Sequence, residues 1–132
     1  MIDPIRHIRK AITDYFAGTF VVYDGIADPK GDFPMVVLTS IAYVENGAKH
    51  CTAYAATVDL SIYNDAAVRG GNLVTDTLSD NVLTWVDDNS FLVPNFSVTD
   101  KRVQNSSTSV VNLFNRILYR RQFTILIELS YG

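Results

Sequence analysis

Residues 54–63 read YAATVDLSIY and carry the clearest strand signal in the chain. The apolar residues of this stretch recur at every second position, as Tyr54, Ala56, Val58, Leu60 and Ile62. A period of two predicts a β-strand with one face toward a core, because successive side chains on a strand point to opposite faces.

A second strand is expected just before it. Met35 to Val44 is a long, mostly apolar run, and Glu45 to Lys49 separates it from the alternating stretch. The Asn46-Gly47 pair within this separator is typical of tight hairpin turns. The two strands should therefore form an antiparallel hairpin.

The N-terminal segment predicts a helix. Asp3-Pro4 is a good helix start, since Asp can cap free backbone amides and Pro loses no hydrogen bond at the first helical position. Apolar residues then recur at helical spacing up to Phe16, and Gly18 is the expected stop. Thr19 to Tyr23 reads as a short strand that leads into a loop.

The C-terminal half predicts one helix and two strands. Apolar residues from Val74 to Trp85 recur at helical spacing, and this helix should end near Asp87. We expect an edge strand from about Phe96 to Val103, because Pro94 precedes it, and a flexible loop over Gln104 to Ser109. Val110 to Tyr119 fits a helical turn or a strand extension, and a terminal strand is predicted from Arg120 onward.

The order α, β, β, β, α, β, β predicts an α+β protein. Its sheet should be antiparallel or mixed, with two helices packed on one face. A chain of 132 residues with no internal repeat or shift in composition fits one domain over residues 1–132.

Composition limits the classes of function. The chain is 48% hydrophobic and 19% charged with a net charge of -3, so it is not disordered and has no broad basic surface for a phosphate backbone. It has one cysteine and no run of transmembrane length. These features predict a soluble protein of a reducing cytoplasm that does not associate with a membrane.

No residue set predicts catalysis, a metal site or a cofactor. His50-Cys51 lacks the second pair of a structural zinc site. Asp24, Asp28 and Asp32 are better explained as turn formers than as a calcium site, because the twelve-residue loop pattern is missing. The segment from Arg69 to Asn72 lacks a phosphate-loop fingerprint, so helix capping explains it more simply.

Two features are candidates for binding. Five cationic residues lie in the C-terminal third and form either an ordinary solvated strand face or a basic patch for an acidic partner or DNA: Lys101, Arg102, Arg116, Arg120 and Arg121. The loop from Gly25 to Asp32 is either a binding element or a plain connection.

The chain resembles the tail terminator, or tail completion, proteins of long-tailed bacteriophages, particularly those similar to the minor tail protein U of phage lambda. The likeness spans nearly the whole chain and is carried by six segments: Ile5 to Phe16, Val22 to Gly25, Phe33 to Leu38, Thr57 to Tyr63, the helix through Trp85, and Tyr119 to Ile125. Where that family has a more polar segment before its last strand, this chain has Val110 to Phe114.

The resemblance implies a structural role in the virion. Proteins of this kind form a hexameric ring that caps the tail tube, stops its polymerisation and presents a surface to the head-side connector. The implied partners are other copies of the chain, the tail tube protein and a connector or neck protein, with DNA passing through the lumen. Assembly would take place in the bacterial cytoplasm.

Loops and exposed strand edges are the expected ring contacts, because a heterologous interface needs two different edges. The predicted contact residues come from three loops and the terminal strand: Asp24, Gly25, Asp28, Lys30, Asp32, Asn46, Lys49, Gln104, Asn105, and Arg120 with Arg121 toward a partner or the lumen. Other possibilities left open are a head-completion or adaptor protein of the neck, a monomeric binding module, and a small enzyme.

Overall fold

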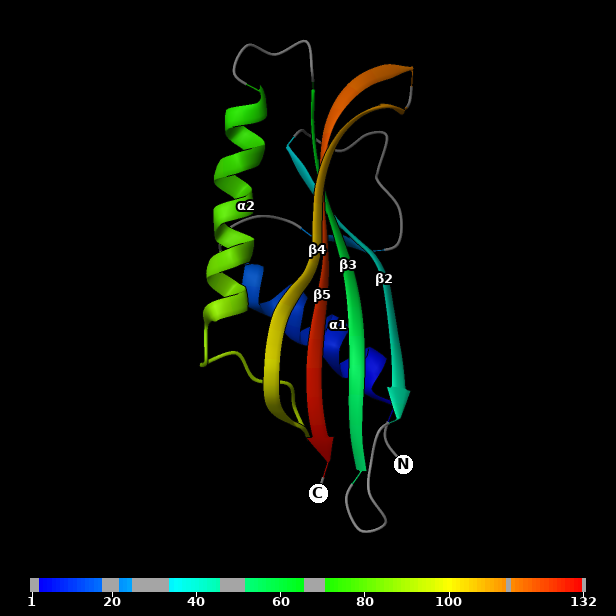
Figure 1. Ribbon diagram of the computed structural model, residues 1–132, viewed down its shortest axis with the longest axis vertical. Helices are drawn as coiled ribbons and strands as arrows, with labels where there is room; N and C mark the ends of the chain where they lie inside the picture. Colours follow the sequence, from blue (N-terminus) through cyan, green and yellow to red (C-terminus); the bar gives the residue numbers. More distant parts are fainter. Residues whose placement is uncertain are drawn as a thin grey trace.

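The residues that the structure describes form two helices and a five-stranded sheet. The computed structural model describes residues 3–17, 22–24, 34–45, 52–65, 71–113 and 115–131. Along the chain the elements are α1 (Pro4–Phe16), β1 (Val22–Asp24), β2 (Met35–Glu45), β3 (Thr52–Asp65), α2 (Gly71–Asp87), β4 (Ser97–Leu113) and β5 (Arg116–Tyr131) (Figure 1). The predicted order of helices and strands is confirmed, and the fold class is α+β.

The sheet is mixed, with the strand order β1-β2-β3-β5-β4. β1 runs parallel to β2, and every other neighbouring pair is antiparallel. β2 and β3 form the predicted hairpin, in which Val36 pairs with Ile62 and Glu45 with Tyr54. β4 lies at the edge of the sheet, as its sequence predicted.

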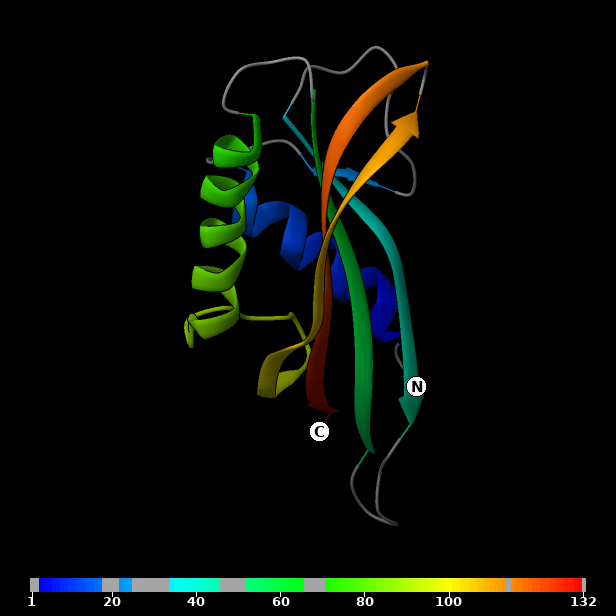
Figure 2. The same cartoon turned by 45° about the horizontal axis from the view of Figure 1, so that its top comes forward.

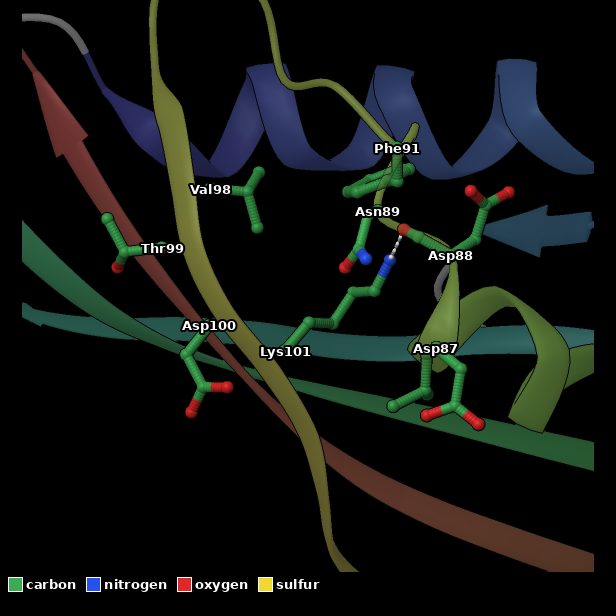
Figure 3. Close-up of a pocket in the computed structure, with 9 residues that line it drawn as sticks. Asp87, Asp88, Asn89, Phe91, Val98, Thr99, Asp100 and Lys101 are labelled. Carbon is green, nitrogen blue, oxygen red and sulfur yellow. Dashed lines mark hydrogen bonds between the residues drawn. The ribbon is translucent and has the colours of Figure 1, made fainter.

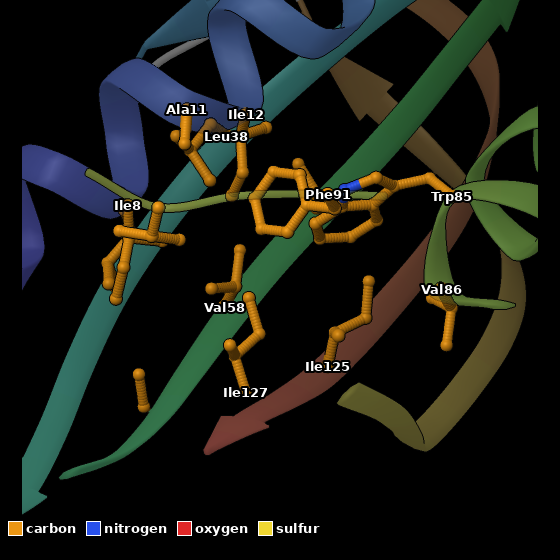
Figure 4. Close-up of a cluster of buried hydrophobic side chains, with 14 of the residues drawn as sticks. Ile8, Ala11, Ile12, Leu38, Val58, Trp85, Val86, Phe91, Ile125 and Ile127 are labelled. Atoms are coloured by element: carbon orange, nitrogen blue, oxygen red, sulfur yellow. The ribbon is translucent and has the colours of Figure 1, made fainter. Parts of the chain in front are cut away.

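Both helices cover the same face of the sheet. The alternating apolar residues of β3 and β5 are buried in one cluster with the apolar faces of α1 and α2 (Figure 4). α1 crosses the strands over β2, whereas α2 runs along them over β3, β4 and β5 (Figures 1 and 2). Neither described helix lies on the opposite face of the sheet.

The helix boundaries follow from capping. The Asp3 carboxylate accepts a hydrogen bond of 3.0 Å from the Ile5 N–H, and Pro4 is the first residue of α1, as predicted. α1 ends at Phe16 with Ala17 as its C-cap, and the predicted stop at Gly18 lies outside the described residues. α2 ends at Asp87, as predicted.

The predicted loop from Gln104 to Ser109 is wrong, because these residues belong to β4. The uncharged polar run resembles a loop in composition, yet its residues from Asn105 to Ser109 each pair with a residue of β5, from Thr124 back to Arg120. Val110 to Leu113 extends the same strand, and β5 begins at Arg116, four residues before the predicted Arg120. The bend between the strands includes Asn115, whose φ of 58° is a conformation that asparagine tolerates well.

Candidate assembly interface

β4 offers a long open edge. It hydrogen-bonds to β5 on one side, and no described strand lies on its other side. Its residues from Gln104 to Val110 are all exposed. In both overall views the β4–β5 hairpin, yellow to orange, bends away from α2 toward its tip (Figures 1 and 2).

The two halves of this edge differ in how they are protected. The first half contains two register shifts, at Val98/Asp100 and Val103/Asn105, and the charged run Asp100-Lys101-Arg102. Bulges and charges are the devices by which natural sheets prevent edge-to-edge association. The second half, Asn105 to Asn112, has regular pairing, no charged residue and no proline. It is therefore free to pair with another strand.

A second open edge lies on the other side of the sheet. β1 pairs only with Val36 to Leu38 of β2. Beyond Leu38, no described strand flanks the outer side of β2. The stretch of that edge from Thr39 to Val44 is also uncharged. Its Ile41 side chain is buried in the core, whereas Val44 is 69% exposed.

The predicted cationic cluster does not form one surface. Arg121 lies on the helix-covered face, where its Nε donates to Ser106 Oγ at 2.9 Å and its guanidinium is 4.0 Å from Asp76. Arg120, one residue earlier, lies on the opposite face, with its guanidinium 5.9 Å from the centre of the Tyr63 ring. Strand alternation therefore separates the two arginines.

The other three cationic residues, Lys101, Arg102 and Arg116, also make contacts within the chain. Arg102 forms an ion pair of 3.1 Å with Asp100, and Arg116 pairs with Asp65. Lys101 points to the helix-covered side, toward Trp85. Each of these contacts lies at a different place on the sheet, so the ordinary solvated strand face describes these residues better than a basic patch does.

Of the remaining predicted contact residues, three lie in described strands and six lie outside the described ranges. Gln104 and Asn105 are exposed on β4, at its second register shift. Asp24 is the last residue of β1 and pairs with Leu38. Six predicted residues lie outside the described ranges, which leaves their contact role a prediction: Gly25, Asp28, Lys30, Asp32, Asn46 and Lys49.

A polar pocket of about 320 Å³ lies where the end of α2 meets β4, a feature that the sequence did not predict (Figure 3). The Lys101 ammonium donates to the Asp88 carbonyl oxygen at 3.0 Å and lies 5.0 Å and 4.6 Å from the Trp85 and Phe91 ring centres. Burial lowers the pKa of Lys101 to about 8, against the opposing effect of Asp88 and Asp87. This lysine fastens the end of α2 to β4.

Asp88 is held by several donors beside this pocket. Its carboxylate accepts hydrogen bonds from the Ser90 hydroxyl at 2.6 Å, the Tyr15 hydroxyl at 2.6 Å and the Ser90 N–H at 2.8 Å. These bonds favour the ionised form and lower the pKa of Asp88 from 3.8 to about 2. They also tie α1 to the segment that follows α2.

We expect this carboxylate to contribute to acid stability. Because the pKa of Asp88 is lower in the folded state, its contribution is fully present above about pH 4 and is lost as the pH falls toward 2. Asp88→Asn should therefore make the fall in unfolding free energy between pH 5 and pH 2 shallower, as measured by urea unfolding across that range. Asp87→Asn, at the exposed neighbour, is the matched control, and equal slopes for Asp88→Asn and the parent would refute the assignment.

The described residues contain neither a group of three His, Cys, Asp or Glu side chains placed to hold a metal nor a helix with the length and apolar character of a membrane span. The described residues form a small α+β protein in which one sheet face carries no described helix and two edges have no described strand partner.

This fold has a counterpart among solved structures. It is similar to that of a chain in a structure described as the virion of a native gene transfer agent particle, with a TM-score of 0.66. The match covers 95% of this chain and 90% of that chain, at 13% sequence identity. No protein-family model and no curated protein sequence matches the chain. The likeness is thus one of fold over nearly the full length of both chains.

Proposed function

We propose that this chain is a structural protein of a phage-like virion, and that within the virion it forms the ring that ends the tail tube. The observation that carries the proposal is the fold shared with a virion chain over 95% of this chain and 90% of that chain. The sequence resemblance to tail terminators supports the particular position. The role requires no catalysis and no cofactor.

The two open edges suit a ring. A closed ring needs a heterologous interface, in which one surface of each copy fits a different surface of the next. β4 and the outer side of β2 are two such surfaces on opposite sides of one sheet. The proposed partners are neighbouring copies, the tail tube protein and a head-side connector, with DNA passing through the ring without sequence-specific binding.

Light scattering on the purified chain tests ring formation. A hexamer of the 14.7 kDa chain would weigh about 88 kDa, which is six times the monomer mass. We expect this mass at micromolar concentrations, with dissociation on dilution. A monomer at every concentration, in the presence and absence of tail tube protein, would contradict the proposal.

Location in the particle tests the position of the ring. A chain carrying an electron-dense label should appear at the head-proximal end of the tail tube in particle images. A label on the head portal instead would assign the chain to the neck adaptors or head-completion proteins.

A further inference from the structure

The second half of the β4 edge and the part of the β2 edge beyond Leu38 share one property, which is that residues 107–112 and residues 39–44 carry no charge. Residues 107–112 of β4 read STSVVN, and residues 39–44 of β2 read TSIAYV. Both contain β-branched residues, which favour strands, and both leave one row of backbone N–H and C=O groups without a described strand partner. Such an edge is a template for pairing with another chain unless an assembly covers it.

The strand directions of these edges are complementary. From β2 to β4 each neighbouring pair is antiparallel, so β2 and β5 run one way and β3 and β4 the other. Rotation about the ring axis preserves the direction of each strand relative to that axis. β4 of one copy would therefore meet β2 of the next as an antiparallel pair, the commoner pairing in proteins.

We propose that residues 107–112 of β4 pair antiparallel with residues 39–44 of β2 in a neighbouring copy. This pairing rests on the ring proposed above. The sheet then continues from subunit to subunit. In this register Ser109 lies opposite Ala42 of the neighbour, and both side chains lie on the helix-free face, as their pairings with Arg120 and Thr57 show.

The register agrees with closure into a barrel. Within one copy Ser109 pairs with Arg120 of β5, Arg120 pairs with Tyr63 of β3, and Tyr63 pairs with Met35 of β2. Ser109 and Met35 therefore lie at the same height along the strands. To meet Ala42 instead, successive copies must shift by roughly six residues, about 20 Å along the strands. The four strands that each copy contributes, β2, β3, β5 and β4, span about 19 Å across the sheet. A shift of about 20 Å over this width requires the strands to tilt by about 45° from the barrel axis, which is at the upper end of the typical range for barrels.

A second copy is the occupant that the geometry favours. Two β4 edges could also pair with each other in a two-fold dimer, but that arrangement would leave both β2 edges uncovered. Head-to-tail pairing covers both uncharged edges with one contact and generates a ring from a single interface. The two arrangements give different cross-linked products.

Cysteine cross-linking tests the pairing. In a Cys51→Ser background, a chain carrying both Ser109→Cys and Ala42→Cys is oxidised with oxidised glutathione and separated on a non-reducing gel. Antiparallel neighbours bring the two positions within disulfide distance, so most of the chain should move into a ladder of multimers that ends at the closed ring. Each single-cysteine chain should stay monomeric on the gel.

The control is Thr84→Cys with Ala42→Cys, since Thr84 is exposed on α2 and belongs to neither edge strand. This pair should give no ladder. Dimers from Ser109→Cys alone would overturn the proposal in favour of β4 pairing with itself. An oligomer in light scattering without a ladder would overturn the edge pairing and leave the ring proposal intact, whereas a chain that is monomeric by both methods would overturn both.

Discussion

Replacing Trp85 with alanine should lower the free energy of unfolding by about 3–5 kcal/mol, the usual cost of removing a large buried aromatic side chain. Trp85 is 0% exposed. Its ring packs edge-on against Phe91 and Phe16, at centroid distances of 5.3 Å and 5.6 Å, and Lys101 lies over it. The indole thus joins α1, α2 and β4, and its loss leaves a cavity where these elements meet.

Urea unfolding followed by circular dichroism measures this loss. Domains of this size have a total stability of about 5–15 kcal/mol, so the alanine variant should be partly unfolded at moderate temperature. Trp85→Phe keeps an aromatic ring in the cluster and should lose clearly less stability. It also removes the indole N–H, which is buried and has no hydrogen-bond partner among the described residues.

A matched control lies two residues earlier on the same helix. Leu83 is 37% exposed, so Leu83→Ala should cost less than about 1 kcal/mol. A loss below about 1 kcal/mol for Trp85→Ala would show that the aromatic cluster does not hold the layers together.

The buried half of this architecture was predictable from sequence because its periodicities are strong. The alternation in residues 54–63 placed every second residue, from Tyr54 to Ile62, on the core side of β3, where these residues are buried. The Asp3-Pro4 start and the spacing from Val74 to Trp85 marked the helices correctly. In each case the burial of one face imposes the pattern.

The edge was not predictable by the same means. A strand that pairs on one side only and is exposed on both faces needs no apolar alternation, so residues 104–109 have the composition of a loop. The pairing that makes them a strand comes from β5, where Ser106 lies opposite Phe123, a residue that is fully buried. The sequence left two alternatives open for the five cationic residues for a related reason, because adjacent residues such as Arg120 and Arg121 point to opposite faces of a strand and a count along the chain does not show this.

The pocket at the end of α2 escaped prediction because its parts come from separate elements. Lys101 reaches from β4 to the backbone of Asp88, and Tyr15 reaches the carboxylate of the same residue from α1. No local pattern announces such contacts. The local sequence signal was the aspartate pair Asp87-Asp88 at the end of α2, which is common at helix ends.

Proline at the residue of the proposed contact whose N–H faces the neighbouring copy should abolish ring formation and leave the subunit folded. On an antiparallel edge strand, successive N–H groups point alternately to the neighbouring strand and outward. Of the two adjacent variants Thr108→Pro and Ser109→Pro, one therefore removes an N–H that bonds to β5, and the other removes an N–H that faces the neighbouring copy. Their effects on stability and assembly should separate.

The inward variant should lower the free energy of unfolding, since it removes a bond of the β4–β5 ladder. The outward variant should unfold like the parent chain, because its N–H has no described strand partner in the monomer. At the interface it loses a hydrogen bond and introduces a clash with the neighbouring strand. Together we expect these to cost about 2 kcal/mol per contact, which is roughly thirtyfold in affinity.

A closed ring amplifies this loss, because every subunit contact in it is weakened equally. At the concentration where the parent chain forms the ring, the outward variant should scatter light as a monomer. Thr84→Pro is unsuitable as a control because it would break α2, so Thr84→Lys serves as the exposed surface change that should leave both stability and assembly unaltered. A normal ring from the outward proline variant would exclude β4 as the contact strand, since strand pairing at this edge depends on the N–H that proline lacks.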